Sequence, residues 1–295
     1  MKHLKTFELI ESVVRAGSIR KAAEDMNITA SALNRRIQGF EQDFGSPIFE
    51  RLPRGMRLNP AGELLMQHIL SQRTDLARVQ SQVADLTGER RGHVAIACSQ
   101  ALLPYFLPKQ IAVYRTEHAG VTFTVNVRDR EQAESDLAAF RCDLALVFEP
   151  IHMVEFEVLH ALPQAVHAVF RSDNPLARKT TLRLRDCVSQ KLALPSPQYG
   201  VRHLLELAAK QKGQALSPVV ETESFELIRH FINHENAVGF QIPVGLNPEE
   251  QASMAHRPIA ELDVPSGRLL LGQKKGRALP VASAKFAQQL IAALI

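Results

Sequence analysis

Cysteine is scarce in this sequence, and a long apolar run is missing altogether. The 295 residues contain three cysteines, Cys98, Cys142 and Cys187, which lie far apart and form no C-x-x-C pair. This spacing argues against a disulfide framework and indicates a reducing compartment, so we expect a cytoplasmic protein. No apolar stretch resembles a signal peptide or is long enough to cross a bilayer, so we expect no membrane partner.

Recognisable catalytic motifs are also missing. There is no P-loop and no G-x-G-x-x-G. His230 and His234 are spaced i, i+4, but Phe231 stands where a zinc hydrolase has glutamate, and no third ligand is evident. Cys98 and Ser99 lack the G-x-S-x-G elbow of a nucleophile, so a buried cysteine on a strand is the better interpretation. We therefore expect no enzyme activity, no catalytic residues, no metal and no cofactor.

Negative charge is scarce in one part of the chain. No acidic residue occurs from Arg51 to Gly62, and residues 1–60 hold 10 Lys/Arg against 7 Asp/Glu. Residues 93–295 are nearly balanced, with 21 against 20. A basic leading segment on a neutral body indicates a polyanion partner at one end, although charge alone would equally fit an ordinary solvated surface. The length exceeds that of one typical domain.

The stretch from Ala16 to Gly45, "AGSIRKAAEDMNITASALNRRIQGFEQDFG", predicts two helices separated by a three-residue turn. Gly17 is suited to end the preceding helix, and Ser18 and Thr29 are suited to cap the two helices. Asn27 can take the left-handed backbone that such a turn requires. Four apolar residues spaced 4, 3 and 4 predict the buried side of the second helix: Leu33, Ile37, Phe40 and Phe44.

The other side of that helix is small and polar. It carries Ala30, Ser31, Asn34, Arg35 and Gln38. Small residues permit close approach to a groove, and Asn and Arg side chains have the geometry to contact adenine and guanine edges. These features favour a helix-turn-helix that places its second helix in the major groove. A plain helical hairpin with a solvated basic face is the alternative.

A short hairpin and a long helix are predicted next. "FERLPRGMRLNPAG", from Phe49 to Gly62, has strand alternation around a Pro-Arg-Gly turn, and its Arg51, Arg54 and Arg57 would hold phosphates as a wing. Asn59-Pro60 then starts a helix. Its apolar 3.5-residue period predicts a dimerising coiled coil, with packing on its own domain as the alternative. The seam positions are Leu65, Ile69, Gln72, Leu76, Val79, Val83 and Leu86, and Gln72 could fix the register.

With these elements in place, the chain resembles a LysR-type transcriptional regulator. The matching residues are Phe7, "AGSIRKAAEDMNITASALNRRI", "FEQDFGSPIFER" and "RGMRLNPAG". The chain departs from the family at Ala30, Asn34 and Arg36, where Gln, Ser and Gln are common, so base preference there does not carry over. The resemblance implies a dimer of dimers on imperfect palindromes near promoters. We expect the DNA contacts to come from Ser18, Thr29, Ala30, Ser31, Asn34, Arg35, Arg36, Gln38, Arg51, Arg54 and Arg57.

From His93 onward, the pattern alternates between strands and helices. Buried strands are expected at 94–99, 121–127, 143–148, 165–170, 191–195, 218–222 and 237–243, and helices at 102–118, 133–141, 201–212 and 225–233. This alternation predicts parallel sheets with crossover connections. Two lobes are expected, with crossings near Leu162-Pro163 and Val264-Pro265. Cys142 precedes a strand, and Cys187 is expected in a helix.

The expected fold class is α+β multidomain. It comprises a winged helix-turn-helix (residues 1–59), a linker helix (60–92) and an α/β effector domain (93–295), which the resemblance makes periplasmic-binding-protein-like. Its lobe I would be 93–162 and 267–295, and its lobe II 163–266. Ligands of such folds bind between the lobes, at strand ends and helix N-termini.

The expected effector-binding residues are Ser99, Gln100, Ala101, Phe148, Gln198, Tyr199, Gly200, Val201, Arg202, Glu223 and Ser224. For each of them, a satisfied helix cap is the alternative. Arg202 and the helix ends favour a small organic anion, such as a carboxylate, as the ligand.

The sequence thus predicts a DNA-binding regulator that responds to a small molecule and works as a homodimer or homotetramer on double-stranded DNA. One alternative is a repressor without a ligand. Another is an enzyme or solute-binding protein with an incidental helical N-terminal domain.

Overall fold

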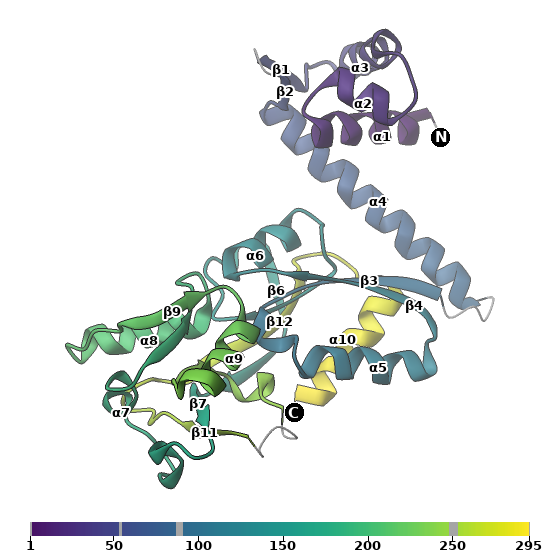
Figure 1. Ribbon diagram of the computed structural model, residues 1–295. Coiled ribbons are helices and arrows are strands. Elements are labelled where there is room, and N and C mark those ends of the chain that lie inside the picture. Colours follow the sequence, from purple (N-terminus) through teal and green to yellow (C-terminus); the bar gives the residue numbers. More distant parts are fainter. Residues whose placement is uncertain (1, 53–54, 87–90, 248–252, 295) are drawn as a thin grey trace. The chain divides into compact units, whose positions relative to one another are not determined.

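The computed structural model describes residues 2–52, 55–86, 91–247 and 253–294 (Figure 1). It divides into two compact units, Met1–Ala77 and Arg78–Ile295. Within the described ranges, no helix combines the length and the apolarity that a bilayer crossing requires.

The first unit is a bundle of three helices with a two-stranded hairpin. Its elements are α1 (Lys2–Ala16), α2 (Ile19–Asp25), α3 (Ala30–Phe44), β1 (Phe49–Leu52), β2 (Gly55–Leu58) and the first turns of α4 (Pro60–Leu86). Ile10, Leu33, Ile37 and Ile48 fill its core and are at most 2% exposed. The hairpin strands are antiparallel, with Phe49 opposite Leu58.

The turns of this unit follow the predicted chemistry with one exception. Gly17 and Asn27 take left-handed backbone with φ of +64° and +53°. Thr29 Oγ1 accepts from Ala32 N at 3.2 Å, and Asn59 Oδ1 accepts from Gly62 N at 2.8 Å, so both predicted caps are confirmed. Ser18 precedes α2 but its side chain makes no capping hydrogen bond, so that predicted cap is wrong.

The apolar stripes of α3 and α4 extend beyond the core they cover. Phe44 is 45% exposed and stacks on Phe40, because the core ends before the last turn of α3. Leu65 and Ile69 of α4 are buried against the first unit, whereas Leu76 and Val79 are 44% and 47% exposed.

The predicted seam therefore needs correction. Leu65 and Ile69, the first two seam positions, pack on the core of the chain's own first unit, which was the alternative interpretation of this helix. Exposed apolar side chains begin only at Leu76. Val83 is 55% exposed and Gln72 is exposed, while the side chain of Leu86 lies outside the described residues.

The first sheet of the second unit has the strand order β4-β3-β5-β12-β6. The strands are β3 (Arg91–Cys98), β4 (Gly120–Val127), β5 (Leu144–Phe148), β6 (Phe156–Gln164) and β12 (Gly267–Lys274). The helix α6 (Arg130–Ala138) contacts one face, and α5 (Phe106–Glu117) and α10 (Val281–Leu294) cover the other. Alternating side chains of β3 explain this division: Val94 and Ile96 join the core beside α10, and Ala97 joins the core beside α6.

A second group of strands lies between β6 and β12 in the chain. Strands β7 (His167–Arg171), β10 (Gly239–Gln241) and β11 (Met254–Pro258) form a sheet of order β10-β7-β11, and β8 (Leu192–Pro195) pairs with β9 (Pro218–Thr222). A bridge between Leu192 and Val238 joins the two groups. The helices are α7 (Leu184–Val188), α8 (Gly200–Gln211) and α9 (Phe225–Glu235), with short 3-10 turns η1 (Gln100–Leu102), η2 (Pro175–Arg178) and η3 (Pro243–Gly245).

The expectation of parallel sheets is only partly correct. β3 pairs in parallel with β4 and β5, and β8 with β9, as crossover connections require. β12 is antiparallel to both β5 and β6, and β7 is antiparallel to β10 and β11. The antiparallel strands include the four that adjoin the two passages of the chain between the sheets, at Gln164–His167 and Pro258–Gly267. The prediction assigned no element to β6, β11, β12 or α10.

The three cysteines are free and buried, at 1% exposure or less. Cys98 ends β3 and Cys187 lies in α7, as expected. Burial raises the pKa of each thiol to about 12, so the thiolate that redox chemistry needs is disfavoured.

Candidate nucleic-acid interface and effector cleft

The predicted DNA-contacting residues Ala30, Ser31, Asn34, Arg35 and Gln38 lie on one face of α3, whereas Arg36 lies on another face of that helix and Ser18 precedes α2. Residues Thr29, Ala30, Ser31, Arg35, Arg36 and Gln38 are exposed, whereas Asn34 and Ser18 are partly buried. The opposite face of α3 is held in the core by Leu33 and Ile37. Side chains with both donors and acceptors are thus presented on a helix whose rotation is fixed by burial.

The hairpin wing is connected to α3 and to the α1–α2 turn. Arg51 Nη2 donates to Asn34 Oδ1 at 3.3 Å. Met56 N donates to Gly17 O at 2.9 Å, and a Cβ on Gly55 would meet that same oxygen at 2.4 Å. The wing therefore takes one orientation relative to α2 and α3.

The three wing arginines differ in their surroundings. Arg51 is exposed beside α3, whereas Arg57 Nε pairs with Glu50 Oε2 at 2.8 Å across the two strands. Arg54 lies outside the described residues. Sequence reasoning noted that the segment after Arg51 has no acid but overlooked Glu50, which the antiparallel register places directly opposite Arg57.

A small cavity marks the expected cleft in the second unit. It has a volume of about 10 Å³, which is room for about one water molecule. Four of the predicted effector residues line it: Ser99, Phe148, Tyr199 and Gly200. A Cβ on Gly200 would meet Phe148 O at 2.3 Å, so only glycine allows α8 to approach the end of β5 this closely.

The remaining predicted effector residues are engaged within the fold around this cavity. Gln100 Oε1 accepts from Phe225 N at 3.1 Å, and Gln198 Nε2 donates to Glu223 Oε1 at 2.8 Å. Ser224 Oγ accepts from Leu227 N as the cap of α9. Ala101 and Val201 are each 2% exposed.

The interpretation of Arg202 as an anion contact conflicts with its position. Its guanidinium bonds Glu206 at 2.8 Å, Glu221 at 2.9 Å and Pro195 O at 3.3 Å. The side chain is 8% exposed and is absent from the lining of the cavity. Arg202 ties α8 to β8 and β9, so its charge is already compensated by two carboxylates.

The cationic groups of the cavity are Arg128 and Arg130, which the sequence analysis overlooked. Arg130 donates to Gln198 O at 3.2 Å and to Glu149 O at 2.9 Å, so it joins the segment before α8 to the end of β5. Arg128 pairs with Asp136 at 2.6 Å. Both arginines follow the end of β4. Ser99 was predicted because ligands bind at the carboxyl ends of strands, and the same reasoning applied to β4 would have found these two arginines.

Burial shifts the pKa values of two groups in the cavity. It lowers the pKa of Arg130 from its ordinary value, and the nearby carboxylates of Glu149 and Glu134 oppose that shift. Burial, followed by the charges of Glu223 and Asp129, raises the pKa of Tyr199, which keeps its hydroxyl protonated. The cavity thus offers two cationic side chains and a neutral hydroxyl donor, which suit an anion, beside one acidic side chain, Asp129.

The histidines considered above as metal ligands, His230 and His234, lie on α9. His230 Nε2 contacts Glu226 Oε1 at 2.9 Å on the exposed side of α9. Among the described residues, no three His, Cys, Asp or Glu side chains converge as metal ligands would.

Two family models match the chain. The bacterial regulatory helix-turn-helix model of the lysR family covers residues 4–63, and the LysR substrate binding domain covers residues 87–294. The chain belongs to the LysR family. The protein is therefore a LysR-type, DNA-binding transcriptional regulator with a domain for a small-molecule effector.

Relatives of this LysR protein agree in sequence and in fold. The transcriptional activator CmpR of Synechocystis sp. is 23% identical over 229 residues, which cover 78% of this chain and 75% of CmpR. Full-length CbnR complexed with its target DNA has a TM-score of 0.63 at 15% identity and covers 99% of both chains. The CcmR regulatory domain of Synechocystis PCC6803, solved in complex with 2-PG, has a TM-score of 0.60 at 19% identity, and the match covers 69% of this chain and 98% of that regulatory domain.

Proposed function

We propose that this regulator reads a duplex with the exposed face of α3 and holds the adjoining backbone with its wing. The observation that carries the proposal is the contact of Arg51 with Asn34, which joins a phosphate-binding side chain to a base-reading one. In this proposal Ser31, Asn34 and Arg35 contact bases, while Arg51 and Arg57 contact phosphates. Arg54, which lies outside the described residues, is proposed as a further phosphate contact from the sequence alone. The structure of CbnR with its target DNA supports this docking for a protein of the same fold.

The test compares two substitutions on a duplex selected from a random library by the purified full chain. Asn34→Ala should relax preference at one base pair, at a cost of about 1–3 kcal/mol against the preferred duplex. Arg51→Ala should weaken binding to all duplexes and lower the salt slope by about one. Lys210→Ala, which removes an exposed cation from α8, is the control and should change neither quantity. Equal loss of selectivity in both variants would contradict the division of roles.

We propose further that a small organic anion binds between the lobes, at the cavity of Ser99, Arg130 and Tyr199. The support is the pair of arginines at a strand end together with the protonated Tyr199 hydroxyl. A cavity of one water is too small for such a ligand, so binding requires the lobes to separate and close again around it. That a domain of the same fold was solved with 2-PG supports a small-molecule ligand here.

Thermal-shift screening of organic acids tests this effector site. A ligand of the folded state raises the melting temperature by mass action. The shift should disappear in Arg130→Gln and persist in Arg202→Gln, because Arg202 lies outside the cavity. Loss of the shift in Arg202→Gln alone would place the anion elsewhere.

We also propose that α4 pairs two copies and that four copies assemble on DNA. Exposed Leu76, Val79 and Val83 support pairing. The proposed division is 1–59 for DNA binding, 60–92 for linkage and 93–295 for effector binding. Closure of the lobes around a ligand would then change the spacing of the DNA-binding heads, provided that the ligand binds the two arrangements unequally. An unchanged DNA bend at saturating ligand would refute this coupling.

The protein is proposed to act in the cytoplasm, as a regulator rather than as an enzyme. The family membership supports this role.

A further inference from the structure

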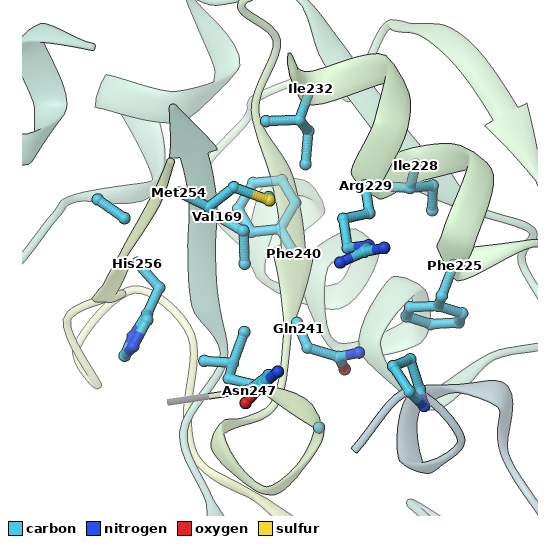
Figure 2. Close-up of a pocket in the computed structure, with 14 residues that line it drawn as sticks. Val169, Phe225, Ile228, Arg229, Ile232, Phe240, Gln241, Asn247, Met254 and His256 are labelled. Atoms are coloured by element: carbon cyan, nitrogen blue, oxygen red, sulfur yellow. The ribbon is translucent and has the colours of Figure 1, made fainter. Parts of the chain in front are cut away.

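A second, larger pocket lies in the lobe formed by the β10-β7-β11 sheet, between that sheet and α9 (Figure 2). Its volume is about 70 Å³. Its floor is apolar and belongs to the packed core of the lobe, because each floor side chain is at most 8% exposed. The floor consists of Val169, Ile228, Ile232, Phe240 and Met254.

The mouth of the pocket is polar and carries a fixed cation. Figure 2 shows Arg229 reaching in from α9 and His256 from β11. Arg229 Nη2 pairs with Glu226 Oε1 at 2.8 Å, and Arg229 is one-third exposed. His256 Nδ1 lies 2.9 Å from His167 Nδ1, so one imidazole hydrogen bonds the other. A guanidinium beside an apolar floor favours a molecule with one apolar and one anionic end.

This pocket is separate from the effector cleft, although Phe225, which lines the pocket, contacts Tyr199 of the cleft. Its ring lines the pocket and stands edge-on to the Tyr199 ring, with centroids 5.7 Å apart. Its backbone N–H donates to Gln100 Oε1 on the cleft side. The two sites therefore lie back to back across the N-terminus of α9.

We propose that this pocket is a second ligand site that binds a short branched-chain carboxylate. A cavity of about 150 Å³ holds benzene. Half that volume accommodates an isopropyl or isobutyl group on the floor of Val169, Ile232 and Phe240. The carboxylate of such a molecule remains at the mouth, where it forms a charge-assisted hydrogen bond with Arg229 in competition with Glu226. The ligand is bound, with no covalent change.

Isovalerate is the probe, titrated into the full-length protein with isoleucine δ1 methyl groups labelled for NMR. The methyl groups of Ile228 and Ile232 should shift together along one saturation curve. Those of Ile96 and Ile10, buried in other cores, should not move. Absence of a shift up to about 50 mM would overturn the proposal, since burial of a few methyl groups beside one ion pair corresponds to a millimolar Kd.

Matched variants separate the pocket floor from its mouth. Ile228→Phe fills the floor and should abolish the shift of Ile232, whereas Leu227→Phe adds the same ring on an exposed position of α9 and should leave binding intact. Equal binding by both variants would overturn the assignment of the floor.

The mouth is tested without touching the core, so failure to fold cannot obscure the result. Arg229→Gln should weaken isovalerate binding about tenfold or more. Glu226→Gln should strengthen binding about two- to fivefold, because it removes the competing carboxylate. Isovaleramide is the neutral analogue of isovalerate. Its Kd for the unaltered protein should equal the Kd of isovalerate for the Arg229→Gln variant. Equal binding of the acid and the amide to the unaltered protein would overturn the anionic class of the ligand.

Discussion

At the scale of single residues, the charge of the wing, which we propose to face DNA, is set by pairs of side chains. Arg51 is held toward Asn34, and Arg57 is held by Glu50. A count of three wing arginines therefore overstates the charge that the free protein presents to phosphates. The side chain of Glu50 is 40% exposed, so its negative charge also repels the phosphates of an approaching DNA backbone.

Glu50→Gln is expected to strengthen DNA binding. The substitution releases Arg57 and removes a negative charge from the wing, so the slope of log K against log salt should steepen by up to about one. Fluorescence anisotropy of a labelled duplex over a series of KCl concentrations measures the slope. Glu117→Gln, an exposed acid of α5, is the control. An unchanged slope in Glu50→Gln would show that Arg57 does not reach phosphate.

A second residue-scale feature is Asp263, a buried carboxylate near the return to the first sheet. It is 5% exposed and accepts from Arg183 Nε and Nη2, each at 2.7 Å, and from Leu184 N at 2.9 Å. The hydrogen bonds from Arg183 are the main reason that the pKa of Asp263 lies well below its usual range, although burial opposes the shift. The ionised carboxylate thus stabilises the folded state.

Asp263→Ala is expected to lower the free energy of unfolding by about 1.5–3 kcal/mol near neutral pH. The folded pKa is depressed, so this stability is present above the unfolded value of about 3.9 and is lost as pH falls through the folded value. Urea unfolding at pH 7 and near pH 3 measures the difference, which should shrink at the lower pH. Asp173→Ala is the control. The side chain of Asp173 is 61% exposed, so its ion pair with Arg171 should contribute little to the free energy of unfolding. A constant difference at both pH values would assign the effect to packing.

At the scale of elements, α4 carries one continuous apolar pattern that serves two purposes. Leu65 and Ile69 complete the core of the first unit, and Leu76, Val79 and Val83 remain exposed beyond it. Contiguous exposed apolar side chains on one stripe of a helix are typical of an interaction surface and are uncommon in monomers. The pattern fits a helix that joins its own domain first and a partner helix afterwards.

Val79→Asp is therefore expected to weaken self-association without unfolding either unit. A charge in the apolar seam must be desolvated in the paired state only, which shifts the monomer–dimer constant by about tenfold or more. Sedimentation equilibrium measures the constant, and far-UV circular dichroism checks the fold. Gln82→Asp adds the same charge on an exposed position off the seam and should leave the constant unchanged. Equal dissociation in both variants would point to general charge repulsion.

Local pattern was sufficient to predict most elements of this chain, and long-range pairing was not. Left-handed turns at Gly17 and Asn27 and the cap at Thr29 depend on neighbouring residues and were predictable. The antiparallel insertion of β12 between β5 and β6 depends on contacts more than a hundred residues apart. The burial of Leu65 and the ion pair of Arg202 with Glu221 likewise required the fold, because period and charge do not specify a distant partner.

At the scale of the whole molecule, two cores stabilise the chain separately. The core of the first unit is built from residues between Leu9 and Ile69, and the main core of the second from residues between Val94 and Leu294. No buried residue of one cluster belongs to the other. Each unit thus has the apolar interior that cooperative unfolding requires.

Calorimetry of the full-length protein is accordingly expected to show two unfolding transitions. Ile69→Ala leaves a cavity in the first core at a cost of about 2–5 kcal/mol and should lower that unit's transition by about 10 °C or more. Ile96→Ala makes the same change at a fully buried position of β3 and should lower only the other transition. If both variants moved one shared transition, the two units would be coupled in folding. A ligand in the second unit would then stabilise the DNA-binding unit directly, and effector binding would act on DNA through stability as well as through geometry.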